Sequence, residues 1–557
     1  MLRPCAYVKL SIPFACTLAT LFTTSAYGQS PARPAMPLDG VVAQTQQPSK
    51  PEGQAAERPQ PTELEKELAA IKAENDAVRE QLRKAEEQQK ALLEMIDRLQ
   101  RQLAGPAAAD AQTIGKPIGP AVTSSASGSA ASAAGKAPQP AASATVASAQ
   151  PAPAVANQGP RERYQDGIVV WQTSDDAAVP FLLKFNNNTQ IRYINTTSAN
   201  DTYTDHLGVV REVHVRNDIT VNRAMFIFGG YIFDPRLRYS STVWTSAGAA
   251  SIVVAANIGW QFNNALTITG GYTGVPGSRS LVNTFPFFTS TDRSMADNFF
   301  RPGFTQGVWA NGEPVKGLYY LAFVGNGLNT LNISANKIDT NLLFSGSVWW
   351  EPLGDYGPPG KSRNMYDDYF ASKDVRIRIG TAFTRSREDR FSNLDQSSPE
   401  NTSMYNSDGV LTFSTGAFAP GVTVDKATYR MFAIDGGIKW NGLAVNAQYY
   451  FRWLDNFLAD GPLPVSSTFD QGFELSAGTF VIPKKVMVYG RGSMVLGQYR
   501  NSWELAGGVK WYFLPTERLW LSAELMRTVN APYSGTFTPY TAGMTAWVPM
   551  IQTVLAF

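Results

Sequence analysis

The chain has 557 residues, a formal net charge of +2 and 44% hydrophobic residues. A near-neutral charge argues against a nucleic-acid-binding protein, which carries a basic excess, so no nucleic-acid partner is expected. Aromatic residues make up 11% of the chain but are absent from 29–163, so this part has no means of building an aromatic core, whereas the remainder is rich in them.

The N-terminus is typical of a secretory signal peptide. Two basic residues precede an apolar run at 10–22, and a site of the kind that signal peptidase cleaves ends at Gly28. We therefore expect residues 1–28 to be removed. Because both cysteines, Cys5 and Cys16, lie in this segment, the mature chain is expected to have no disulfide and no cysteine metal site.

Residues 62–105 are predicted to form an α-helical coiled coil. Leucine at position a of the heptad, combined with isoleucine or valine at position d, favours three or more helices, and Asn75 and Gln89 within the seam fix the register. We therefore expect this segment to be a trimerising stalk. The alternative is a lone amphipathic helix on a surface. The residues at positions a and d of one register are Leu64, Leu68, Ile71, Asn75, Val78, Leu82, Ala85, Gln89, Leu92, Ile96, Leu99 and Leu103.

Two segments of low complexity flank the predicted coiled coil. Residues 29–61 are rich in proline, alanine and glutamine, and residues 106–164 consist almost entirely of alanine, proline, serine, glycine and threonine. Such compositions predict a disordered segment and a disordered linker, respectively. A glycosylated stalk is an alternative for the second segment that composition does not separate.

Residues 165–557 show short stretches in which apolar and polar residues alternate. In 443–453, apolar and aromatic residues alternate with Asn446, Gln448 and Arg452, which is the pattern of a strand with one apolar face. The last such stretch ends on Phe557 itself. A barrel in lipid leaves no unpaired edge when its last strand pairs with its first, whereas an ordinary β protein would expose this strand as an edge.

The connections between these stretches alternate between short and long. Outer-membrane barrels have short turns on one side and long loops on the other, and the count of strands is about sixteen, with an uncertainty of two. The fold class is therefore an all-β transmembrane barrel of about 16 antiparallel strands, preceded by the α-helical coiled coil and the disordered linker. One connection, 351–374, should be a short turn and is long. Short turns are predicted at 234–236, 263–265, 312–314, 441–442, 483–484 and 515–517, and long loops at about 197–216, 275–303, 327–340, 386–427, 454–469 and 531–543.

A barrel of about sixteen strands is too wide for its own side chains to fill and leaves an aqueous channel. The loop 275–303 is the candidate for narrowing this channel, with Arg279, Asp292, Arg293 and Arg301 as its charged residues. Ten basic groups against four acidic ones predict a channel that prefers anions. For any single residue, the alternative is a charge that is paired with a neighbouring side chain and does not act on the solute. The candidate pore-lining residues, taken from the face opposite the apolar one, are Lys184, Arg192, Arg223, Arg238, Arg376, Arg378, Lys439, Arg452, Arg491 and Lys510, against Asp435, Glu474, Glu504 and Glu524.

Several short motifs resemble the phosphate-selective porin O/P family, over about residues 165–557. The motifs are Gly229-Gly230, Asp234-Pro235-Arg236-Leu237, Asp292-Arg293-Ser294, Gly303-Phe304 and Val324-Gly325-Asn326-Gly327, together with the coiled coil and the alanine- and proline-rich linker. The resemblance implies a homotrimeric sixteen-stranded barrel in the bacterial outer membrane, with arginines along an anion path and the coiled coil in the periplasm. It also implies outer-membrane lipid and the barrel assembly machinery as partners. The paired arginine that commonly opens the second strand of the family appears here only as Asn222-Arg223.

Other functions remain as alternatives. A dicarboxylate porin with a similar stalk is the nearest, a general diffusion porin is another, and a trimeric surface protein whose coiled coil binds peptidoglycan is a third. An enzyme is not expected, because both histidines, His206 and His214, lie in one predicted loop, and a metal site there with Asp201 and Asp205 is a weak alternative. We therefore predict no catalytic residue, no metal and no cofactor.

Deleting residues 62–103 should lower the stability of the trimer without unfolding the barrel, because the heptad seam joins subunits while a closed ring of strands needs no neighbour. Dissociation of the oligomer on heating in mild detergent, followed by native electrophoresis, measures this effect. A full-length protein that migrates as a monomer in mild detergent would contradict the trimer.

Overall fold

The computed structural model describes residues 83, 164–174, 176–246, 251–282, 284–330, 338, 340–358, 364–393, 403–535 and 537–557. The predicted signal peptide and disordered segment lie outside the described residues. So do the predicted coiled coil, apart from Arg83, and the predicted linker, apart from Tyr164. The description below therefore concerns the part of the chain from residue 164 onward.

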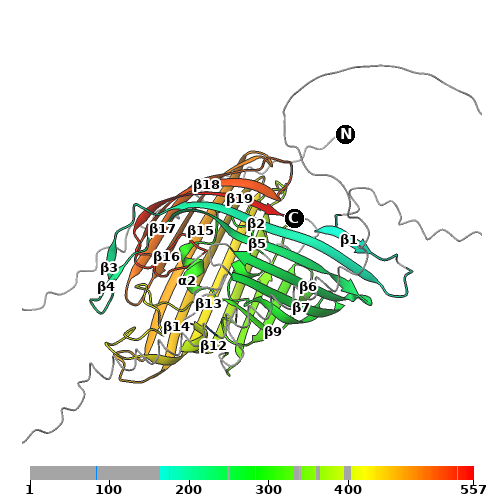
Figure 1. Cartoon of the computed structure of the whole chain (residues 1–557). Helices are drawn as coiled ribbons and strands as arrows, with labels where there is room; N and C mark the ends of the chain where they lie inside the picture. The colour runs from blue at the N-terminus through cyan, green and yellow to red at the C-terminus, as the bar shows by residue number, and fades with distance from the viewer. Residues whose placement is uncertain are drawn as a thin grey trace, which may run out of the picture. The chain divides into compact units, whose positions relative to one another are not determined.

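The described residues form a closed antiparallel β-barrel (Figure 1). The sheet has 17 strands, and because β1 (Ile168–Gln172) pairs only with β2, sixteen strands close the ring. This confirms the predicted fold class. The sixteen are β2 (Phe181–Asn195), β5 (Asn217–Ile232), β6 (Asp234–Ser246), β7 (Ser251–Asn263), β8 (Leu266–Gly274), β9 (Phe304–Val315), β10 (Leu318–Gly325), β11 (Leu343–Trp350), β12 (Arg376–Asp389), β13 (Val424–Trp440), β14 (Leu443–Ala459), β15 (Ser467–Ile482), β16 (Val486–Leu496), β17 (Asn501–Trp511), β18 (Leu519–Val529) and β19 (Ala546–Ala556).

The C-terminal strand closes the ring, as the alternation of its residues predicts. β19 pairs with β2 in a register that places Gln552 opposite Arg192. At the end of this ladder, the Phe557 N–H donates to the Asn187 carbonyl (2.9 Å) and the Asn187 N–H donates to the Phe557 carbonyl (2.8 Å). The Phe557 ring packs edge-on against Phe185, with 5.8 Å between the ring centroids. β1 then continues along the edge of β2 beyond the C-terminus, pairing with residues 182–185 (Figure 1).

The two faces of the ring differ in chemistry because side chains alternate along each strand. On β14, Asn446, Gln448 and Arg452 are buried on the enclosed face, whereas the alternate residues from Leu443 to Trp453 face outward. The outward residues on β12, β13 and β18 include exposed isoleucine, phenylalanine and leucine side chains. An apolar outer face with a polar enclosed face is the pattern of a barrel surrounded by lipid.

No helix among the described residues is long and apolar enough to span a membrane.

Most short connections lie at one end of the ring, the turn end, and most long ones at the other, the loop end. The exceptions among the described connections include 351–375, which is long and lies at the turn end, and 497–500, which is short and lies at the loop end. The prediction was inaccurate in detail because several strands run further than their apolar residues. The turn between β9 and β10 is 316–317 rather than 312–314, and the long loops 390–423 and 460–466 are shorter than expected. The first long loop carries its own hairpin, β3 (Thr202–Thr204) and β4 (Val210–Glu212), and the loop 390–423 begins with α3 (Arg390–Asn393).

Removing Phe557 should impair assembly of the barrel more than conduction through it, because it removes the last backbone pair of the closing seam and the ring contact to Phe185. The amount of folded barrel in the membrane and the single-channel conductance measure the two effects separately. Phe557→Tyr, which keeps an aromatic ring, is the matched control. Normal membrane levels of the deleted protein would count against this role.

Candidate functional site

The loop 275–303 lies inside the ring, as predicted for a constriction loop. It contains η2 (Arg279–Leu281) and α2 (Met295–Phe300), and every residue of α2 is buried. α2 begins after Ser294, whose hydroxyl accepts a hydrogen bond from the Asp297 N–H, as expected of an N-cap serine. The helix contacts β14, β15 and β16, so the loop reaches the wall opposite its own strands (Figure 1).

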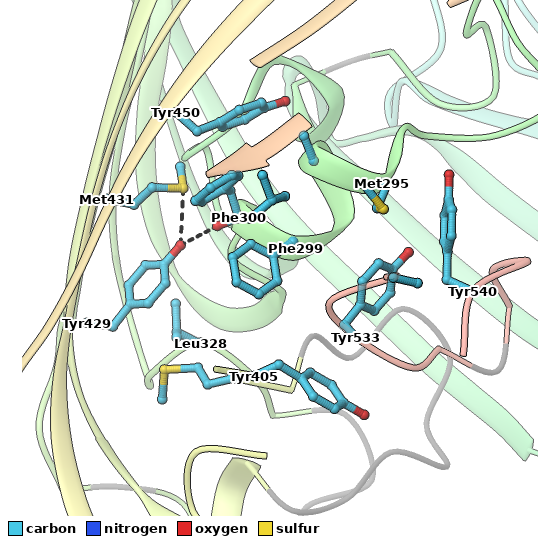
Figure 2. Close-up of a cluster of buried hydrophobic side chains, with 14 of the residues drawn as sticks. Met295, Phe299, Phe300, Leu328, Tyr405, Tyr429, Met431, Tyr450, Tyr533 and Tyr540 are labelled. Carbon is cyan, nitrogen blue, oxygen red and sulfur yellow. Dashed lines mark hydrogen bonds between the residues drawn. The ribbon is translucent and has the colours of Figure 1, made fainter. Parts of the chain in front are cut away.

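Aromatic side chains hold α2 on its apolar side (Figure 2). Phe300 stacks on Tyr450 with 5.2 Å between the ring centroids, and its carbonyl accepts a hydrogen bond from the Tyr429 hydroxyl. Gly472 on β15 makes room for this ring, because a Cβ there would lie 2.5 Å from Phe300. Tyr405 and Tyr533, from two other long loops, complete the cluster, so the lumen is partly filled by protein at this level.

Ion pairs hold the other side of the loop. Asp292 lies between two buried arginines of the barrel wall, 2.6 Å from Arg192 and 3.2 Å from Arg223. A register shift after Gln190 makes a bulge at Asn222, so that Asn222 and Arg223 are both buried. Simple alternation without the bulge would place only one of these two neighbours on the enclosed face.

Arg491 anchors the same loop from β16. Its guanidinium donates to the carbonyls of Asp292 (2.7 Å) and Arg293 (3.2 Å) and pairs with Glu524 at 3.0 Å. Glu524 in turn accepts from the Thr291 N–H, and Glu504 accepts from the Met295 N–H at the start of α2, both at 2.9 Å. The wall carboxylates therefore satisfy backbone donors of the loop, and the wall arginine satisfies backbone acceptors.

The long connection between β11 and β12 also enters the ring. We call its described parts, 351–358 and 364–375, the lumenal turn. The Lys439 ammonium donates to the carbonyls of Tyr356 (2.6 Å) and Met365 (2.8 Å), and the Lys510 ammonium pairs with Asp367 at 2.7 Å. The Tyr366 N–H donates to the carbonyl of Phe287 in the constriction loop. The sequence showed that this connection is unusually long but gave no sign that it folds inward.

Three basic side chains gather where the lumenal turn meets the constriction loop. Arg378 pairs with Asp435 at 2.9 Å, Arg279 lies 4.0 Å from the same carboxylate, and Arg279 and Lys439 both lie over the Tyr356 ring. We call Arg279, Arg378 and Lys439 the basic cluster. The Nη2 of Arg279 and the Nη1 of Arg378 are buried and make no hydrogen bond with described residues, although the Nη1 of Arg378 lies 3.7 Å from the Glu351 carboxylate.

Most of the ten candidate pore-lining residues are buried and bonded. Arg192, Arg223, Arg378, Lys439, Arg452, Arg491 and Lys510 are buried and bond to carboxylates or carbonyls; the partner of Arg452 is Asp470, at 2.7 Å. Lys184, Arg238 and Arg376 lie near the turn end with part of the side chain exposed. In the loop, Arg293 lies 3.6 Å from Asp297, and Arg301 donates to Asn298. Their assignment to an anion path stays a prediction.

The two inserted segments bring charges of both signs into the ring, because the constriction loop also carries Arg279, Arg293 and Arg301. Asp292 and Asp297 in the constriction loop and Asp367 in the lumenal turn add to the carboxylates of the wall, and Asp470 lies near the loop end of β15. A cavity between the loop and β15–β16 is lined by both signs of charge. Its charged residues are Asp292, Arg293, Asp297, Glu474 and Arg491.

The histidine loop makes a contact between loops. The Nδ1 of His206 lies 2.6 Å from Asp408, and the imidazole stacks on Tyr499. Burial raises the pKa of Asp408, but hydrogen bonds from His206 outweigh burial and hold that pKa below its usual value. Asp205, a candidate partner in a metal site, pairs instead with Arg211. Within the described part of the chain, no three His, Cys, Asp or Glu side chains are placed to hold a metal ion.

Comparison with known proteins gives only distant structural likenesses. No family model and no curated protein matches the sequence. Among solved structures, the chain is similar to the outer-membrane-expressed OmpT of Vibrio cholerae (TM-score 0.41, 12% identity, 70% of this chain and 100% of that one). It is also similar to the anion-selective porin from Comamonas acidovorans (0.39, 11%, 67% and 100%) and the outer-membrane channel DcaP of Acinetobacter baumannii (0.39, 8%, 69% and 99%). At such identities and scores, these likenesses carry no argument about function.

Asp292→Asn should loosen the constriction loop, because it leaves Arg192 and Arg223 buried together without their shared counter-charge, and breaking a buried pair costs about 3–5 kcal/mol. We expect noisier and larger single-channel currents from a barrel that still closes. Asp234→Asn, which removes an exposed carboxylate at the turn end, is the control. Wild-type currents in the Asp292 variant would show that this ion pair does not hold the loop.

Proposed function

We propose that the chain is an outer-membrane porin, through which small solutes diffuse passively along a water-filled path. The observation that carries this proposal is a closed ring of sixteen strands whose outer face is apolar and whose enclosed face is polar and charged. In lipid, only a closed barrel or a helix satisfies every backbone group, and this ring leaves no edge. In this proposal the coiled coil lies in the periplasm, and the protein is a homotrimer that performs no catalysis.

The route for solute is proposed to run beside the wall formed by β5, β6 and β7. Ile227, Thr242 and Ala255 lie opposite one another on the enclosed face of these strands, and each keeps part of its surface exposed. On the other side of the ring, the enclosed residues of β14 to β18 are mostly buried beneath the constriction loop and the lumenal turn. A ring of sixteen strands is wide enough for both the filling and a path.

We further propose that the path prefers anions, with small oxyanions such as phosphate as the substrate class. The support is the basic cluster, in which one donor of Arg279 makes no hydrogen bond with described residues, and one donor of Arg378 has only the Glu351 carboxylate at 3.7 Å. A guanidinium remains charged at any usable pH and can hold an oxyanion through two parallel hydrogen bonds. Phosphate and dicarboxylates both fit this chemistry, and the resemblance to phosphate-selective porins is the reason for preferring phosphate.

Conductance of the purified full-length protein in a planar bilayer tests the proposal. Ohmic current steps, with a reversal potential across a salt gradient that favours anions, are the expected result. Block of chloride current by phosphate more than by succinate would support the finer assignment. A barrel that inserts and carries no current would overturn the channel and favour an enzyme or a surface anchor.

The double change Arg376→Ala with Arg378→Ala should reduce the anion-to-cation permeability ratio and weaken block by phosphate. Both arginines lie on the enclosed face, since Arg376 faces Lys439 and Arg378 faces Gly437 in the register of β12 and β13. The measurement is the reversal potential across a salt gradient. Arg527→Ala, which removes an arginine from the outer face of β18, is the control.

Removing Arg378 leaves Asp435 without its nearest partner, so the single change Arg378→Lys is needed beside the double one. Lysine keeps the charge and lacks the planar pair of donors, so it should preserve anion preference while weakening phosphate block. An unchanged reversal potential in the double variant would show that these arginines do not influence permeation, and Arg293 and Arg301 would then be the next residues to test.

A further inference from the structure

The outer face of the barrel carries an unusual group of arginines on β12 and β13. The pairing of these strands sets Arg385 directly opposite Arg430, and Arg387 opposite Thr428. Alternation places Arg385 and Arg387 on the face away from the buried Thr384 and Ser386. We call Arg385, Arg387 and Arg430 the outer arginine patch.

The patch lies at the border of the apolar belt. Along β13 the outward residues run from Trp440 at the turn end through Ile438, Ile434 and Phe432 to Arg430, which is 440 − 430 = 10 positions further on. Ten residues at about 3.4 Å each, tilted by about 40°, rise roughly 26 Å, close to the apolar height of about 25 Å in such barrels. Arg430 and Arg385 therefore lie where hydrocarbon would give way to headgroups at the loop end.

Aromatic side chains lie beside and below the patch. Phe344 is the cross-strand partner of Arg385, Phe383 lies two positions before it on the same face, and both rings are about half exposed. Trp453 on β14 is the cross-strand partner of Arg430. Rings of this kind mark the interfacial level of a membrane barrel, so the patch adjoins acyl chains on one side and water on the other.

The charges of the patch are only partly balanced within the described residues. Arg430 pairs with Asp455, and Arg387 donates to the Thr428 hydroxyl (3.2 Å) and the Asn456 carbonyl. Arg385 is exposed, and its side chain makes no hydrogen bond or ion pair with described residues. Nearby, Asp425 pairs with Arg390, and Asp389 is the cross-strand partner of Lys426. Like charges directly opposite on one face are destabilising unless an anion lies between them.

We propose that the outer arginine patch binds the phosphate groups of anionic lipid headgroups in the leaflet around the loop end. A phosphate between Arg385 and Arg430 would accept charge-assisted hydrogen bonds from both guanidiniums, while its acyl chains cover Phe344 and Phe383. The patch side chains face outward and have aromatic neighbours, and both features favour a lipid over free phosphate as the ligand. The inference rests on the proposed membrane location of the barrel and does not depend on conduction or anion preference.

The full-length protein is first reconstituted in bilayers of phosphatidylcholine mixed with phosphatidylglycerol. The protein is then released from the bilayer, and native mass spectrometry measures which lipid it retains. The wild type should retain phosphatidylglycerol in preference to phosphatidylcholine. The double change Arg385→Gln with Arg430→Gln should abolish this preference, and high salt should reduce it. Arg236→Gln, which removes an exposed arginine at the turn end, should retain it.

Arg385→Gln alone provides the test if the double variant does not fold, because Arg385 has no bonded partner to lose, and Arg385→Lys should restore part of the preference. Phosphatidylglycerol retained equally by the wild type and the glutamine variants would overturn the proposal. So would suppression of lipid retention by inorganic phosphate alone, which indicates a free-anion site, or dissociation of the oligomer in the variants, which indicates a contact between subunits. The porin proposal is tested separately: if it is wrong, the wild-type protein will carry no current in a planar bilayer.

Discussion

Every strand of the ring depends on a single closure, the pairing of β19 with β2. Backbone groups in hydrocarbon have no water to bond, so each unpaired group on an open edge costs several kcal/mol. Closure removes both edges at once, and the bonds between Phe557 and Asn187 complete the ladder at its turn end. Because β2 is longer than the ladder with β19, β1 occupies the remaining edge, so the segment preceding β2 takes part in the seam.

A ring of this size does not pack its own interior, and the chain fills part of it from both ends. The constriction loop enters from the loop end and the lumenal turn from the turn end, and they meet at the bond between Tyr366 and Phe287. Both bring carboxylates and backbone carbonyls to arginines and lysines of the wall. Burying a charge costs much free energy unless it is paired, so the wall cations and the inserted segments require one another.

The ring of strands could be predicted from the sequence, but the contacts of the segments inside the ring could not. Alternation with period two separates the two faces directly: Ile379 faces outward and Arg378 inward because a shift by one residue would put charges into hydrocarbon. The residues that pair with those charges could not be predicted from the sequence. Arg192 bonds to a carboxylate 100 residues away and Lys510 to one 143 residues away, in segments whose path inside the ring has no periodic signal. The alternation of apolar and polar residues likewise does not predict the bulge at Asn222.

The same limit applies to counting charges along strands, which gives an incomplete account of the charges inside the ring. A count by strand parity contains only the wall, whereas Asp292 and Asp367 arrive with the inserted segments and pair with wall cations. Asp297 pairs with Arg293 of its own loop. Under the proposed function, selectivity would come from the few donors that pairing leaves without a hydrogen bond, and their number depends on where the two segments lie. In this proposal the ion preference of the pore depends on the position of the constriction loop, because a displacement of the loop would change which guanidiniums face the path.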